Sequence, residues 1–358
     1  MTYRIAVDVG GTFTDVIAVD ETGRTTFAKA PSKPENQAIG TMDGIERLAA
    51  ALGFDVPDLL GQTERIVHGM TVATNALLER KGARVGLLTT AGHRDVLEMR
   101  EGLKPERYNM RLARREPLVP RHLRFGVKER IRADGRIEVP LDRASLDAAI
   151  ERLKADDVTS VAVCYLHAYR DPRHERETLE VLEKAMPGVT VSLSSDVLPQ
   201  IKEYERGSTT VVNAYVAPLI ALYLRRLEER LVEAGFGGPL MIILSPGGVA
   251  PVAEAVRVAA ATVLSGPAGG LAGGRRVAEI LDAPNLITFD VGGTSSDIAL
   301  IAGGEPTLSK DRTMAGERIA LPSLDIVTLG AGGGSLARVE ASGLLEVGPE
   351  SAGSVPGP

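Results

Sequence analysis

The chain has 358 residues, of which 44% are hydrophobic and 25% charged, and its formal net charge is −6. This is about twice the length of a typical ~150-residue domain, so we expect two domains, each with its own core. The acidic balance argues against nucleic acid as a partner, and a single cysteine excludes disulfides, a cysteine metal site and a self-contained iron–sulfur cluster. No run of ~18 apolar residues and no signal-peptide pattern is present, so the sequence predicts a cytoplasmic protein without a membrane segment.

The first distinctive stretch is "DVGGTFTD", residues 8–15, between the apolar runs "YRIAV" and "VIAVD". β-Branched runs on both sides of a Gly-Gly pair predict a strand, a tight turn and a second strand. A P-loop or a dinucleotide fingerprint would open a helix instead, and the chain has no Gly-Lys pair. The amides of Gly10 and Gly11 and the hydroxyls of Thr12 and Thr14 suit a polyanion.

Helices and strands alternate after this hairpin, which predicts an α/β fold. Helical spacing covers 36–52 and 71–81, with Thr71 as N-cap and Gly82 as stop. "RVGLLTT" and "VTSVAVCYLH" read as buried strands, and in the second Cys164 reads as a small buried hydrophobe.

Two residues around the start of the 71–81 helix are candidate substrate contacts, His68 and Asn75. For His68 the alternative is a packed or capping histidine. Residues 100–130 contain ten Arg or Lys and four Glu, so this segment is positively charged although the net charge of the chain is negative. This basic segment is either a solvated face or a contact for a partner subunit or an anionic substrate.

A long helix is expected over 205–236, with an apolar stripe at Leu224, Leu227 and Leu231. We place the domain boundary just before it, giving domains of residues 1–195 and 196–358. "LMIILS", "NLITFDV" and "DIALIAG" then read as strands, and a helix starts at Ser265-Gly266-Pro267. Backbone donors at such a start suit an anion, so Gly266 is a candidate binding residue.

"DVGGTSSD", residues 290–297, repeats the first motif with only two letters changed. It again predicts a glycine-bearing hairpin, whose candidate phosphate ligands are Gly292, Gly293, Thr294, Ser295 and Ser296. Asp8 and Asp290 end the incoming strands, where a carboxylate can hold a hydrated Mg²⁺ that bridges phosphate oxygens. Two such hairpins imply two similar half-molecules that close on one nucleotide.

The pair resembles the phosphate motifs of the actin, sugar kinase and heat-shock chaperone ATPase superfamily. The ordered set of "HGMTVATNALLE", "SGPAGG" and "GAGGGS" resembles, more narrowly, the hydantoinase A, 5-oxoprolinase and acetone carboxylase β-subunit family. The resemblance covers essentially the whole chain. It implies a two-lobed, actin-like (ribonuclease H-like) α/β fold that binds ATP and Mg²⁺.

The resemblance also implies a role for the chain. It would be the ATP-binding subunit of an enzyme that phosphorylates a ring amide or carbonyl oxygen, after which water opens the ring. In the ketone carboxylase alternative an enol phosphate is carboxylated instead. Asp8, Asp15, Asp290 and Asp297 would be catalytic, one of them orienting the attacking oxygen. Gly332, Gly333 and Gly334 of "GAGGGS" would contact the nucleotide, a flexible loop being the alternative. A hydantoinase B-type partner subunit and a hetero-oligomer are expected.

Two positions depart from the family pattern, Met70 after His-Gly and Val327 before the glycine-rich loop, so no hydroxyl or histidine role carries over to them. A small-metabolite kinase and a non-catalytic actin-like scaffold ATPase stay as alternatives. The tail "ASGLLEVGPESAGSVPGP" has no closing helix. We therefore expect an incomplete second lobe that belongs to a longer subunit.

Overall fold

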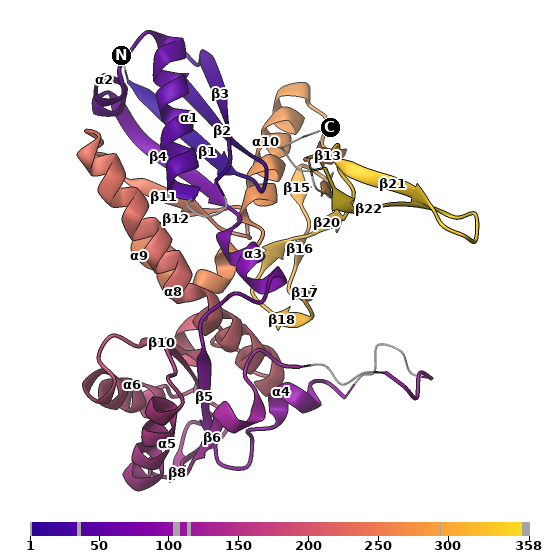
Figure 1. Ribbon diagram of the computed structural model, residues 1–358. Coiled ribbons are helices and arrows are strands. Elements are labelled where there is room, and N and C mark those ends of the chain that lie inside the picture. The colour runs from indigo at the N-terminus through magenta and orange to yellow at the C-terminus, as the bar shows by residue number, and fades with distance from the viewer. Residues whose placement is uncertain (1, 34–36, 103–107, 113–115, 294, 353–358) are drawn as a thin grey trace.

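The computed structural model describes residues 2–33, 37–102, 108–112, 116–293 and 295–352. Figure 1 shows a six-stranded sheet at one end of the molecule and a four-stranded sheet at the other, joined by a long helix. A third sheet lies beside the first. The expected alternation of helices and strands is confirmed.

The six-stranded sheet has the order β12-β11-β4-β1-β2-β3. Its strands are β1 (Tyr3–Val9), β2 (Phe13–Asp20), β3 (Thr25–Pro31), β4 (Thr63–Met70), β11 (Leu240–Ile243) and β12 (Val249–Pro251). Alternate residues of β1 are buried on the face that α1 (Gln37–Leu52) covers, and α2 (Val56–Gly61) follows α1. Because β11 and β12 come from beyond residue 195, the predicted boundary does not separate one sheet from another. As a division between domains it stays a prediction.

The four-stranded sheet, in the order β10-β9-β5-β6, is parallel throughout. It contains β5 (Val85–Thr90), β6 (Arg124–Val127), β9 (Ser160–Cys164) and β10 (Thr190–Leu193), with α5 (Arg143–Ala155) and α6 (Arg173–Ala185) in the connections. Every residue of β5 and β9 is buried, as expected for a parallel sheet covered on both faces, and Cys164 is buried as predicted. A small hairpin, β7 (Arg130–Ile131) with β8 (Ile137–Val139), follows β6.

Helix α8 (Glu203–Glu233) confirms the predicted long helix and continues through Pro218. Leu224, Leu227 and Leu231 are buried as expected. By length and composition α8 could cross a membrane, but 72% of that apolar window is buried inside the protein, as in a core helix. Helix α3 (Val72–Leu78) ends before the predicted stop at Gly82. Thr71 occupies the N-cap position as predicted, although its side chain donates to the Val9 carbonyl and makes no capping hydrogen bond.

The third sheet pairs β13 (Leu286–Val291) with β14 (Ser296–Ala302), which also pairs with β15 (Glu305–Pro306) and β20 (Ile326–Leu329). Helix α10 (Ser265–Leu281) begins where the sequence predicts and packs Ala268 and Leu271 against Ala299 and Ile301. The opposite face of this sheet is apolar and open to solvent. Its exposed side chains include Ile287, Phe289, Val291 and Leu300.

Short elements complete the chain. They are α4 (Val96–Met99), α7 (Ser194–Val197), α9 (Val252–Arg257), the 3₁₀ helices η1 (Arg121–Leu123) and η2 (Ala259–Thr262), β16 (Leu308–Ser309), β17 (Arg312–Met314), β18 (Glu317–Ile319) and β19 (Ser323–Leu324). A projecting hairpin, β21 (Ser335–Val339) with β22 (Leu345–Ser351), follows (Figure 1), and as predicted no closing helix comes after it within the described residues.

Candidate functional site

Both glycine motifs form the predicted hairpin, and the two hairpins share local geometry. In the first, Asp8 lies directly across from Asp15, and the Gly10 amide donates to the Phe13 carbonyl at 3.0 Å. In the second, Asp290 lies directly across from Asp297, and the Gly292 amide donates to the Ser295 carbonyl at 2.8 Å. Each motif therefore presents a pair of carboxylates beside a tight glycine turn.

Helix α10 brings the two hairpins together, since it contacts strands of both sheets. A Cβ atom added to Gly266, in its first turn, would lie 3.1 Å from Oδ1 of Asp8. One turn later, a Cβ atom on Gly270 would lie 3.9 Å from Oδ2 of Asp290. The two carboxylates predicted to hold Mg²⁺ thus meet at the N-terminal turns of one helix, where the helix dipole favours negative charge.

The carboxylates also influence one another electrostatically. Burial first, and then the charges of Asp15, Asp290 and Asp297, raise the pKa of Asp8 to about 6. The Asp8 side chain keeps solvent contact on one side while protein atoms displace water from the others. Burial also raises the pKa of Asp297, although a hydrogen bond from Thr328 opposes this. The site carries more negative charge than its own cations neutralise.

The two turns also approach each other. A Cβ atom added to Gly293 would lie 3.1 Å from Oγ1 of Thr12. A phosphate group between these turns would therefore have to separate Thr12 from Gly293. Ser295 lies in the same turn, half-buried, and Thr294 lies outside the described residues.

The glycine-rich loop is bonded to the second hairpin. The amides of Gly333 and Gly334 donate to the carbonyls of Gly292 and Gly293, and the Gly332 amide donates to Oγ of Ser335. The sequence predicts that these glycines contact the nucleotide. In this conformation their amides are already used, so such a contact would involve other atoms of the loop.

Two of the predicted phosphate ligands, Thr14 and Ser296, are buried. Thr14 is fully buried and shares a hydrogen bond with Ser32, whose hydroxyl donates to the Gly10 carbonyl. Ser296 is buried and donates to the Ala331 carbonyl. Both hydroxyls therefore support the turns in this conformation, which the in–out alternation along each strand could have indicated, and their role as phosphate ligands stays a prediction.

The two candidate substrate residues differ in exposure. His68 has no exposed surface, its Nε2 lies 2.7 Å from the Tyr223 hydroxyl, and burial lowers its pKa to about 4. These features favour the packed histidine over a substrate contact. Asn75 is half-buried on α3, with its amide 3.4 Å from the Thr71 hydroxyl.

Sequence reasoning missed other residues of the site. Lys29 lies across from Asp15 on β3 and forms a 3.0 Å ion pair with it. Gly69 leaves room for Asp8, because a Cβ atom there would lie 3.0 Å from its Oδ1. The Thr22-Gly23 turn between β2 and β3 could have fixed the register that aligns Lys29 with Asp15.

Comparisons with known proteins agree with this architecture. Residues 4–186 match the family described as the hydantoinase/oxoprolinase N-terminal region, and residues 206–358 match hydantoinase/oxoprolinase. The chain is 41% identical to caprolactamase subunit alpha of Pseudomonas jessenii, over 99% of this chain and 51% of that protein. It is 32% identical to the acetone carboxylase beta subunit of Xanthobacter autotrophicus, over 98% and 50%.

Solved structures show the same fold. The crystal structure of the ATP-dependent caprolactamase from Pseudomonas jessenii matches with a TM-score of 0.87, over 99% of this chain and 52% of that one. A nucleotide-free structure of acetone carboxylase, 32% identical, also gives 0.87, over 99% and 51%. The chain therefore has the α/β, actin-like ATPase type of fold. It belongs to the hydantoinase/oxoprolinase family, and it spans about half the length of these relatives.

Proposed function

We propose that this chain is the ATP-binding part of an ATP-dependent enzyme that phosphorylates the oxygen of a ring amide so that water can open the ring. The observation that carries the proposal is the meeting of Asp8 and Asp290, from two separate hairpins, at the first turns of α10. The likeness to a caprolactamase subunit supports an amide as the substrate.

The carboxylates fit a magnesium ion that comes with a nucleotide. Within the described ranges, no three His, Cys, Asp or Glu side chains group closely enough to hold a metal by themselves. Mg²⁺ commonly takes only one or two carboxylates and completes its shell with phosphate oxygens and water. Asp8 and Asp290 would supply those carboxylates, and a cation there would oppose the burial and the neighbouring carboxylate charges that raise the pKa of Asp8. When bound, the ion would neutralise charge on the transferring phosphoryl group.

The remaining groups would position the reactants. The turns at Gly10–Thr12 and Gly292–Gly293 would enclose the phosphates after Thr12 and Gly293 separate. Lys29 already neutralises Asp15. Asp297 has no ion pair within the described residues and has a raised pKa, so we assign to it the orientation of the attacking oxygen.

A ketone carboxylase is the second candidate. It is favoured by the similarity to the acetone carboxylase beta subunit and its matching fold. The same first step, phosphorylation of a carbonyl oxygen, would serve it. For either reaction we propose that a hydantoinase B-type partner subunit carries the second step, since these two relatives are themselves named as subunits.

Calorimetric titration with Mg-ATP tests the nucleotide site. We expect binding that requires Mg²⁺ and weakens at least roughly tenfold in Asp8→Ala and in Asp290→Ala, since each removes a charged ligand. Glu229→Gln, at an exposed carboxylate on α8, is the matched control and should bind as the unaltered protein does. Undiminished binding in both aspartate variants would contradict the proposal.

A product assay separates the candidate reactions. Ring opening coupled to ADP release, seen once the partner subunit is added, supports the amide hydrolase, and bicarbonate-dependent carboxylation of a ketone supports the second candidate. A stable phosphorylated product would identify a kinase. ATP-dependent sedimentation of the protein without turnover would identify a scaffold.

A further inference from the structure

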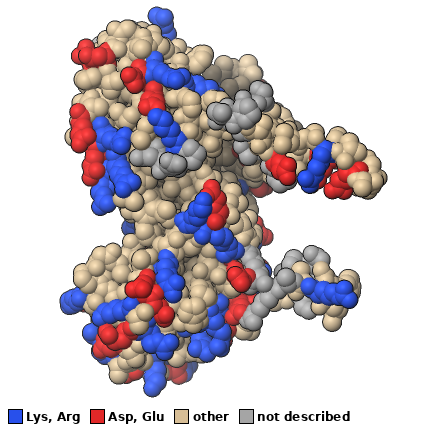
Figure 2. Space-filling view, viewed as in Figure 1, with Lys and Arg blue, Asp and Glu red and all other residues tan. Residues whose placement is uncertain are grey.

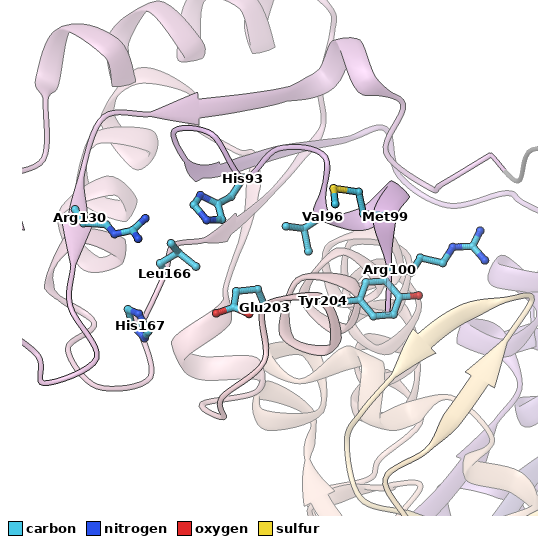
Figure 3. Close-up of a pocket in the computed structure, with 9 residues that line it drawn as sticks. All are labelled: His93, Val96, Met99, Arg100, Arg130, Leu166, His167, Glu203 and Tyr204. Atoms are coloured by element: carbon cyan, nitrogen blue, oxygen red, sulfur yellow. The ribbon is translucent and has the colours of Figure 1, made fainter. Parts of the chain in front are cut away.

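A pocket of about 390 Å³ lies in the four-stranded unit, away from the carboxylates described above. Figure 3 shows Arg130, His93, Glu203 and His167 around a common space over Leu166. Val96, Met99 and Tyr204 form a largely apolar wall beside it, where Arg100 also lies. Its size is that of a site for a small molecule.

The sheet topology also indicates a binding site at this pocket. The pocket lies where three parallel strands end: His93 follows β5, Arg130 follows β6, and Leu166 and His167 follow β9. From β5 the chain goes to β6 on one side and then returns to β9 on the other. In open parallel sheets, ligands bind outside the carboxyl ends of the strands, at such a reversal of strand order.

The charges of the pocket are not paired with one another. Figure 2 shows basic and acidic side chains interspersed over this unit. Within the basic segment, residues 100–130, Arg121 forms an ion pair with Asp95 and Arg124 forms one with Glu98. By contrast, the side chains of Arg130, Arg100 and Glu203 have no hydrogen bond or ion pair among the described residues, although each is half-buried. A charged group without a protein partner is free to pair with a charged group of a ligand.

A buried arginine lies near the pocket. Arg206 is 1% exposed, and its Nη2 donates to the Tyr165 carbonyl at 2.7 Å, whereas Nε and Nη1 have no hydrogen-bond partner in the part of the chain that the structure describes. Its guanidinium lies 5.4 Å from the ring centre of Tyr169, which contacts His167 of the pocket. At His167, Arg206 and Arg130 therefore contribute positive charge and Glu203 contributes negative charge.

We propose that this pocket binds a small amino carboxylate, with the carboxylate held by Arg130 and the ammonium group by Glu203. Val96, Met99 and Leu166 would contact the alkyl chain between them. The choice of ligand rests on the proposed function: when water adds to a ring amide and the C–N bond breaks, the carbonyl carbon becomes a carboxylate and the nitrogen an ammonium group. A metal is not the occupant indicated, because no set of three metal-ligating side chains is found here or elsewhere in the described residues.

Calorimetric titration of the protein with ω-amino acids, from glycine to 6-aminohexanoate, tests the proposal, with hexanoate and hexylamine as matched probes. We expect the longer amino acids to bind, and Arg130→Ala to weaken that binding roughly tenfold. Glu203→Gln should weaken binding of the amino acid but leave hexanoate unchanged. Arg143→Ala, at an exposed ion pair on α5, is the control for loss of a surface arginine.

Absence of binding by every amino acid, equal binding of hexanoate and 6-aminohexanoate, or unchanged binding in Arg130→Ala would each overturn the proposal. Far-ultraviolet circular dichroism confirms that each variant is folded, and Arg130→Lys, which keeps the charge, should retain part of the affinity. Asp290→Ala separates this proposal from the nucleotide site. It should weaken Mg-ATP binding and leave amino acid binding intact.

Discussion

The two hairpins have nearly the same sequence and the same turn geometry, but they lie in different surroundings. Strand β1 of the first lies inside its sheet, between β4 and β2, and Tyr3, Ile5, Val7 and Val9 are at most 5% exposed. Among the described strands, β13 of the second hairpin pairs with β14 alone, and its Ile287 is 68% exposed.

The comparison shows that the motif determines the turn geometry, whereas the surrounding elements determine how deeply each strand is buried. The Gly-Gly turn and the facing aspartates need only local hydrogen bonds, so both copies form them. Burial depends on which elements cover the strand. We therefore expect the first hairpin to contribute more to the stability of the 358-residue chain than the second.

The largest expected difference comes from removing a matched isoleucine before each turn. Ile5→Ala on β1 should lower the free energy of unfolding by about 2 to 5 kcal/mol, because it leaves a cavity in the core. Ile287→Ala on β13 should lower it by less than about 1 kcal/mol, since that side chain is in solvent. Urea unfolding of the two variants measures both. An equal loss would show that the exposed face is covered in solution.

A smaller change in the free energy of unfolding should appear on acidification, and it should come from a residue of the first sheet. His68 on β4 lies beside Val7 of β1, and burial lowers its pKa to about 4. Between about pH 6.5 and pH 4, His68 is protonated in the unfolded chain but neutral in the folded chain. The free energy of unfolding should therefore fall across this range as the pH drops, by on the order of 3 kcal/mol. His68→Gln should flatten this slope in urea titrations at several pH values. A slope that persists in the variant would assign the acid sensitivity elsewhere.

The smallest effect concerns the aspartates themselves. The pKa of Asp8 is raised to about 6, so its ionisation opposes folding above that pH and has no effect below about pH 4, where the group is protonated in both states. Asp8→Asn should therefore stabilise the protein at pH 8, by about 1 kcal/mol at most because solvent reaches the side chain. Asp297→Asn should give a smaller gain, since the Thr328 hydroxyl already stabilises that carboxylate. Thermal unfolding at pH 4 and pH 8 checks both, and a gain at pH 4 would contradict this cause.

Local patterns predicted the elements well. The apolar runs beside each Gly-Gly pair gave the four strands of the hairpins, and the leucine spacing gave α8. The start of α10 at Ser265 followed from its Ser-Gly-Pro sequence. These features depend on interactions within a few residues, which a single sequence contains.

Features that depend on distant residues could not be predicted in this way. His68 is buried against Tyr223, 155 positions later, and β11 joins the sheet of β1 from beyond the expected boundary. The amides of Gly333 and Gly334 are taken by the second turn, which nothing in "GAGGGS" itself indicates. The pocket between β5, β6 and α8 likewise exists only after the chain has folded.

Helix α10 has a mechanical consequence. Gly266 and Gly269 face Asp8 and Ile243 of the first sheet, and Gly270 and Gly274 face Asp290 and Thr288 of the third. A Cβ atom on Gly269 would lie 3.1 Å from Cδ1 of Ile243, and one on Gly274 would lie 2.4 Å from Cγ2 of Thr288, so side chains of both sheets sit directly against the helix backbone. A larger residue at any of these glycines would push one sheet away from the helix. It would thereby change the separation of Asp8 and Asp290 while leaving each hairpin intact.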